Sequence, residues 1–184
     1  WEDAQGIQQV NEQEECSLSL ILFDGDGNPL EETVLTGVEL KDGVRFFALE
    51  KVGDKFFAMS GRRLVCFDSN GQELDNISLD NSQFLAMCRR GDELVVSCFN
   101  FDQEAFGCEL SVIKADDKLS LTGIYRSTGS IVTGLGVTKD GEILLANEKG
   151  VYYLKEERGL TEPLAMWSEM GALMPEYSSV IPYK

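Results

Sequence analysis

Oxygen-bearing side chains at alternate positions are the first candidates for chemistry in this sequence. Asp24, Asp26 and Asn28 lie within five residues of one another, and carboxylate and amide oxygens are ligands that Ca²⁺ prefers. The segment departs from an EF-hand loop, because Pro29 stands where the sixth-position Gly is needed and Leu35 where the twelfth-position Glu is needed. A turn is therefore the favoured interpretation, and a weak cation site at Asp24, Asp26 and Asn28 is the alternative.

A second candidate is an aromatic stretch with an acidic side chain. Residues 99–107 contain Phe99, Phe101 and Phe106 around Asp102. Long connections in a regular scaffold often carry recognition. Folding of this loop onto its own unit is favoured, and ligand binding by Phe99, Phe101, Asp102 and Phe106 is the alternative.

Nucleophilic and metal-ligating residues are sparse. The chain has no histidine, which excludes a Ser–His or Cys–His pair and a His-ligated metal. The five cysteines form no C-x-x-C pair, so zinc and thiol-redox sites lack their usual spacing. Cys66 and Cys88 stand in apolar runs and are expected to be buried. For Cys98 and Cys108 free thiols are favoured, and a disulfide is the alternative.

Length and charge narrow the class of protein. The chain has 184 residues, 43% of them hydrophobic, and a formal net charge of -16, which fits one acidic globular domain and disfavours nucleic-acid binding. It contains no apolar run long enough to span a membrane. Residues 1–40 hold ten acids and no Lys or Arg, so residues 1–16 are predicted to be an acidic leader or edge strand before a domain at 17–184. The alternative is a patch for a basic partner or a cation.

An internal repeat indicates the elements that must position these residues. The segment Leu20–Leu30 aligns with Leu64–Leu74 at an offset of 44 residues, sharing Leu, Phe, Asp, Gly and Leu. A second motif, an apolar run after Gly-Asp or Asp-Gly, recurs after residues 54, 92 and 141. Such short apolar runs between turn residues are typical of β-hairpins.

The repeat predicts an all-β protein, a β-propeller-like array of four-stranded antiparallel blades, about four in number, complete or partial. The expected units are two strands at 17–36 and full units at 44–80, 82–127 and 131–167. Six phenylalanines are expected to pack between units: Phe46, Phe47, Phe56, Phe57, Phe67 and Phe84.

A partial array leaves two end faces without a packing neighbour. The first face is expected to carry Leu18, Leu20 and Leu22, and the last to carry Leu144, Val151 and Tyr153. Residues 168–184 either supply an inner strand to the first unit, or two chains pair their open faces. A monomer is favoured over a homodimer.

The stretch from Gly134 to Trp167, with G-L-G-V-T-K-D-G-E-I-L-L-A, resembles a blade of a bacterial extracellular propeller. Together with the F-D-x-x-G-x-x-L motif it resembles the propeller regions attached to extracellular solute-binding lipoproteins of Gram-positive gut bacteria. The resemblance implies an exported, surface-associated module and transfers no functional residues.

These observations favour a non-catalytic binding module at the cell surface or outside the cell, without a cofactor. Its partner would be a protein, peptide or glycan. The alternative is a calcium-dependent hydrolase that resembles the metal-dependent lactonases of the propeller class, with Asp140 and Asn147 as candidates near the axis.

Overall fold

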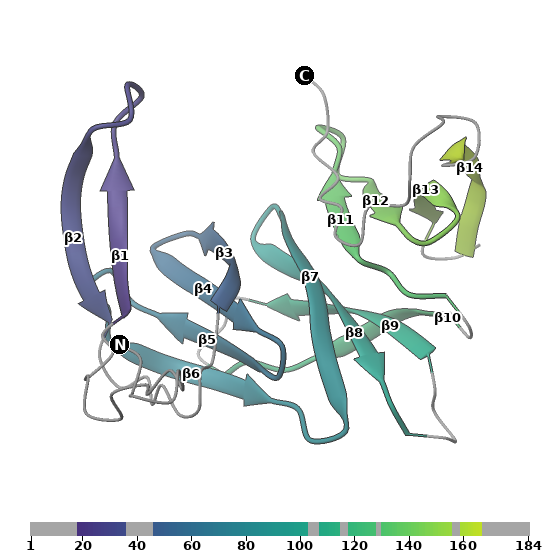
Figure 1. The fold of residues 1–184 in the computed structure, drawn as a ribbon, viewed down its shortest axis with the longest axis horizontal. Coiled ribbons are helices and arrows are strands. Elements are labelled where there is room, and N and C mark those ends of the chain that lie inside the picture. The colour runs from purple at the N-terminus through teal and green to yellow at the C-terminus, as the bar shows by residue number, and fades with distance from the viewer. Residues whose placement is uncertain are drawn as a thin grey trace, which may run out of the picture.

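The computed structural model describes residues 18–35, 46–102, 107–114, 118–127, 130–155 and 159–166. Across these ranges it contains fourteen β-strands in four antiparallel sheets (Figure 1). In these ranges no helix has the length and apolar character needed to cross a membrane. The predicted all-β class with four-stranded antiparallel sheets is confirmed.

Sheet 1 has two strands and the other three sheets have four, each in a simple meander. Sheet 1 consists of β1 (Leu18–Phe23) and β2 (Pro29–Leu35). Sheet 2 consists of β3 (Phe46–Val52), β4 (Lys55–Ser60), β5 (Arg63–Phe67) and β6 (Glu73–Ser78). Sheet 3 consists of β7 (Ser82–Arg90), β8 (Glu93–Asn100), β9 (Gly107–Lys114) and β10 (Thr122–Ser127). Sheet 4 consists of β11 (Gly134–Val137), β12 (Ile143–Ala146), β13 (Gly150–Lys155) and β14 (Gly159–Met166).

The sheets follow one another in chain order, and each packs on its neighbours. Sheet 1 stands at one end of the array and sheet 4 at the other (Figure 1). The first strands of the three full sheets are close in space, since β3 contacts β7 and β7 contacts β11. The edges formed by these first strands therefore converge, while β6, β10 and β14 form the opposite edges.

Three apolar cores separate the four sheets. Phe57, Leu64 and Phe84 lie in the core between sheets 2 and 3. Leu110 and Leu145 lie in the core between sheets 3 and 4. Sheet 3 is therefore covered on both faces, and β8 is a continuous buried run, LVVSCF, instead of an alternating one.

Sheet 1 packs on sheet 2 through a smaller core. Leu20 is buried there against Phe56, Val65 and Phe67. The expectation that Leu20 would lie on the open end face is therefore wrong. The outward face instead carries Ile21, which alternation places opposite to Leu20 and which is 46% exposed.

The expected last face of the array lies on sheet 4. Ile143 and Leu145 lie in the core shared with sheet 3, so alternation places Leu144 on the opposite face, as expected. Leu144 is buried there, and Val151 and Tyr153 are half-buried. Among the six phenylalanines expected in the cores, Phe47 is the exception, with 53% of its surface exposed on β3.

Candidate functional sites

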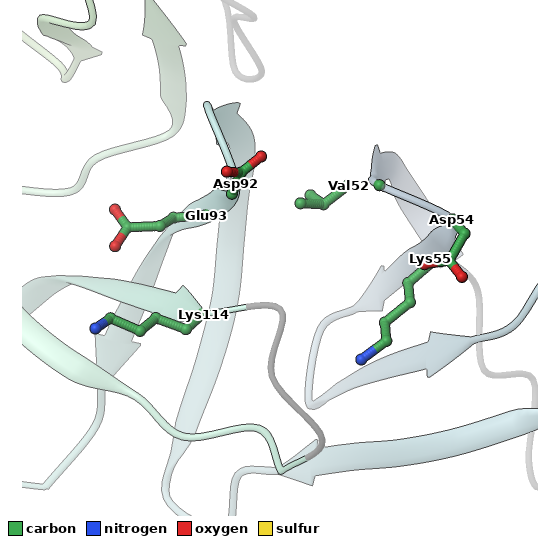
Figure 2. A pocket seen from close by; sticks show the side chains of 7 residues that line it. Val52, Asp54, Lys55, Asp92, Glu93 and Lys114 are labelled. Carbon is green, nitrogen blue, oxygen red and sulfur yellow. The ribbon is translucent and has the colours of Figure 1, made fainter.

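A pocket of about 360 Å³ lies between the first hairpin turns of sheets 2 and 3. We call it the rim pocket, and it is lined by Val52, Gly53, Asp54, Lys55, Asp92, Glu93 and Lys114. Figure 2 shows Val52 and Asp54 on the β3–β4 hairpin and Asp92 on the β7–β8 hairpin across from it. Lys114 comes from the end of β9, where it is directly opposite Glu93 in the strand register.

The rim pocket carries charges of both signs. The Glu93 carboxylate accepts a hydrogen bond from the Arg90 guanidinium at 3.0 Å, which neutralises it. Across the described part of the chain, the exposed carboxylates of Asp54 and Asp92 and the Lys114 ammonium make no side-chain hydrogen bond or ion pair. The lining has no hydroxyl, thiol or imidazole group, so it can bind a charged ligand but holds no nucleophile of these types.

No single motif predicts this pocket, but the internal repeat contains a signal for it. Gly53-Asp54 and Gly91-Asp92 are equivalent dipeptides in two consecutive units. Two equivalent turns on neighbouring sheets must come to the same rim of the array. The repeat therefore indicates the neighbouring placement of Asp54 and Asp92 as well as the strands.

The aromatic candidates fall on both sides of a strand end. Phe99 was expected in a loop, but it belongs to β8, pairs with Cys108 and is 8% exposed in the core between sheets 3 and 4. Phe101 follows the strand, is 51% exposed and contacts Phe99 edge-on, with ring centroids 5.1 Å apart.

The backbone of Phe101 and Asp102, which follow β8, makes two further hydrogen bonds. The backbone N–H of Phe101 donates to the Asn81 carbonyl at 3.0 Å, and that of Asp102 donates to the Asn100 side chain at 2.9 Å. Phe106 lies outside the described residues. Of the predicted set, the structure therefore brings Phe101 and Asp102 together on the surface, while Phe99 serves as the packed support of Phe101.

Both oxygens of the Asp24 carboxylate accept hydrogen bonds from residues of the same turn. Its Oδ1 accepts the backbone N–H groups of Asp26 and Asn28 at 2.9 and 2.8 Å, and its Oδ2 accepts the Asn28 amide at 2.9 Å. The hydrogen bonds from Asn28, with smaller ones from the loop backbone, lower the pKa of Asp24. In the equivalent turn of sheet 2, Asp68 Oδ1 likewise accepts the backbone N–H groups two and four residues on, and its Oδ2 accepts the Asn70 amide, which supports the turn interpretation.

The four described cysteines are buried and free. Phe99 is opposite Cys108 and Cys98 is opposite Glu109, so the two cysteines point to opposite faces of sheet 3. Cys98 lies in the core shared with sheet 2 and Cys108 in the core shared with sheet 4. This register excludes the disulfide alternative. Burial raises the pKa of Cys98 to about 12 and that of Cys108 to about 11.

The candidates for a hydrolase are not brought together. Asp140 lies in the exposed turn before β12, and Asn147 follows the other end of that strand. Asn147 is buried, and its Oδ1 accepts the backbone N–H groups of Lys149 and Gly150 at 2.9 and 3.1 Å. In the ranges that the structure covers, no group of three or more Cys, Asp or Glu side chains could hold a metal ion.

Comparison with known proteins gives a fold and no function. No family model matches this chain, and no curated protein matches it. A crystal structure of a protein of unknown function from Bacteroides caccae, at 1.35 Å resolution, matches 78% of this chain with a TM-score of 0.51 and 12% identity. The match covers 53% of that protein, so this chain corresponds to about half of its length. The likeness is one of fold: this is an all-β chain similar to a bacterial protein of unknown function.

Proposed function

We propose that the protein is a non-catalytic binding module that engages a peptide or protein segment carrying a basic side chain, and that the rim pocket is its site. The observation that carries the proposal is the pair Asp54 and Asp92. They come from equivalent turns on two sheets, line one pocket and lack an ion-pair partner among the described residues.

The chemistry of the pocket favours a peptide over a sugar. Two carboxylates suit an ammonium or guanidinium group, and Lys114 suits a carboxylate on the same ligand. The lining has no aromatic ring on which a sugar could stack. The net charge of -16 adds a long-range attraction for a basic partner, which raises the association rate.

In the same proposal the four sheets are consecutive blades of a β-propeller-like array on a bacterial surface. The repeat, the meander order of each sheet and the convergence of β3, β7 and β11 support the array. The resemblance to propeller regions of extracellular lipoproteins supports the location. The rim pocket is formed by turns that a regular scaffold holds in place, which is where binding residues are often found.

The test is titration calorimetry against a library of short peptides with Lys or Arg at one position, with a glycan array in parallel. Asp54→Asn with Asp92→Asn should weaken binding at least tenfold, and higher salt should weaken it further. The control is Asp140→Asn, which changes an exposed aspartate outside the pocket, in the equivalent turn of sheet 4. The proposal would be contradicted if the double substitution left the peptide affinity unchanged, or if the protein turned over a bound ligand.

A further inference from the structure

Across the described ranges, sheet 1 has two strands fewer than each of the other sheets. The motif shared by Leu20–Leu30 and Leu64–Leu74 makes β1 the equivalent of β5, and β2 the equivalent of β6. In sheet 2 the other edge of β5 pairs with β4, which pairs with β3. No described strand pairs with the corresponding edge of β1, and one expected source of a strand, residues 168–184, lies outside the described residues. Backbone N–H and C=O groups on such an edge are a template for another extended segment.

An apolar groove of about 290 Å³ lies beside this edge, between β1 and β3, and we call it the edge groove. Ile21 lines it from β1, and Phe47 and Leu49 line it from β3. These three side chains are 46%, 53% and 55% exposed. Strand β7 contacts a first strand on each side, β3 and β11, but the described part of sheet 1 provides no first strand for the other side of β3. The edge groove therefore lies where the two missing strands of sheet 1 would pack.

We propose that the edge groove binds a two-stranded β-hairpin of a partner protein, which pairs with the open edge of β1 and gives sheet 1 four strands. Strand addition of this kind combines main-chain hydrogen bonds with pockets for alternate side chains. One face of the hairpin lies on Phe47 and Leu49, so that face is apolar. This surface is separate from the rim pocket, which lies between sheets 2 and 3 and is lined by a different residue of β3, Val52.

Charge specifies the solvent-facing side of the hairpin. Residues 18–35 carry four acids and no base: Asp24, Asp26, Glu31 and Glu32. The nearer strand of an added hairpin lies two strand spacings, about 10 Å, from β2 and its glutamates, which is within the Debye length at low salt. The partner hairpin should therefore carry Lys or Arg. A second copy of this chain is disfavoured as the occupant, because it would bring the same acids to the groove.

The probe for the test is the chain's own β3–β4 hairpin, made as a synthetic peptide of residues 46–60. Its second strand, β4, pairs with β5, so it has a side-chain pattern suited to β1, the equivalent of β5. Phe46 and Ser60 are partners in the strand register, so the peptide can be cyclised through its ends and held as a hairpin.

Two charge forms of this peptide test the stated chemistry. The lysine form carries Glu50→Lys with Asp54→Lys. The glutamate form carries Lys51→Glu with Lys55→Glu. In titration calorimetry at low salt, the lysine form should bind the full chain at least tenfold more tightly than the glutamate form, and the difference should shrink as salt is added.

The rim pocket is also proposed to bind basic peptides, so the two sites must be told apart. The titration is repeated with a chain that carries Asp54→Asn and Asp92→Asn, which removes both carboxylates of the rim pair. The affinity for the lysine form should be unchanged. The edge groove and the rim pocket can therefore fail or succeed independently.

The binding position is tested by hydrogen exchange and by a matched pair of leucines in the protein. With the lysine form bound, the β1 amides that do not bond to β2 should exchange at least tenfold more slowly than in the free chain. Leu49 is 55% exposed in the edge groove, and Leu74 is 49% exposed on β6 and does not line the groove. Leu49→Asp in the protein should weaken binding at least tenfold, and Leu74→Asp should leave it unchanged.

Several results would overturn the proposal. They are an absence of binding by the lysine form, equal affinity of the two forms at low salt, and binding that Leu49→Asp does not weaken. Binding that is lost with Asp54→Asn and Asp92→Asn would place the peptide in the rim pocket instead. Slow exchange of the β1 edge amides in the free chain would show that this chain already pairs with that edge, or that a second copy does if the protection depends on protein concentration.

Discussion

At the scale of single residues, both oxygens of the Asp68 carboxylate accept hydrogen bonds from its own turn. Hydrogen bonds from the backbone of Gln72 and Asn70 lower the pKa of Asp68. The folded state therefore gains stability from the ionised form above the usual pKa of an aspartate, and loses it as pH falls through the lowered value. Asp68→Asn should be less stable than the original chain at pH 7, and the difference should shrink near pH 3.

Urea unfolding at both pH values measures this difference. Asp80→Asn, an exposed position after β6, is the control and should change little at either pH. A gap between Asp68→Asn and the original chain that stays constant from pH 7 to pH 3 would contradict the role of the ionised turn.

The buried thiols give a second prediction at this scale. Burial raises the pKa of Cys66 to about 11 and that of Cys88 to about 12. Because the thiolate is the reactive form, a Cys16→Ser variant should react with a thiol reagent at pH 8 only after unfolding. Since these pKa values are raised, stability should also fall as pH rises above the usual range of a thiol. Rapid labelling of any of the four cysteines in the folded protein would contradict their burial.

At the scale of elements, the turn between β5 and β6 holds sheet 1 against sheet 2. Gly71 has a φ of +79°, and a Cβ placed there would lie 2.7 Å from the Val34 carbonyl oxygen. Gly91 has a φ of +61° but open space around it. Gly91→Ala should therefore lose about 1 kcal/mol from backbone strain alone.

Gly71→Ala combines the strain with a clash against backbone and should lose more than twice as much stability in urea unfolding. It should also raise hydrogen exchange in β2, which Gly91→Ala should leave unchanged. Equal losses in the two variants would show that sheet 1 does not depend on this close approach.

The repeat predicted the elements well because strand periodicity and turn residues are local signals. The units expected at 44–80, 82–127 and 131–167 correspond to sheets that span 46–78, 82–127 and 134–166. What failed was the assignment of faces. Leu20 was placed on the wrong face and Phe99 in a loop, because a strand's orientation depends on which neighbour covers it. The rim pocket depends on contacts between units, which no single motif encodes.

At the scale of the whole molecule, sheet 3 lies between two separate apolar cores, one on each of its faces. Val96 lies in the core shared with sheet 2, and its neighbour Val95 lies in the core shared with sheet 4. Both side chains are fully buried. Each substitution to Ala should cost about 1.5–3 kcal/mol, from lost apolar burial.

The two variants should differ in which sheets lose protection from hydrogen exchange. In arrays whose units contact only their neighbours, stability is nearly a sum of unit and interface contributions. Val96→Ala should raise hydrogen exchange mainly in sheets 2 and 3, and Val95→Ala mainly in sheets 3 and 4. Identical exchange maps for the two variants would indicate one indivisible cooperative unit instead.

The placement of Cys98 and Cys108 on opposite faces of sheet 3 also sets an order of events for the nascent chain. Before β8 and β9 pair, only nine residues separate the two cysteines, so an oxidant could join them easily. A chain cross-linked in this way cannot adopt the β8–β9 register, and both cores that sheet 3 supports would then fail to form. If the protein folds in an oxidising compartment, β8 and β9 must therefore pair before Cys98 and Cys108 are oxidised.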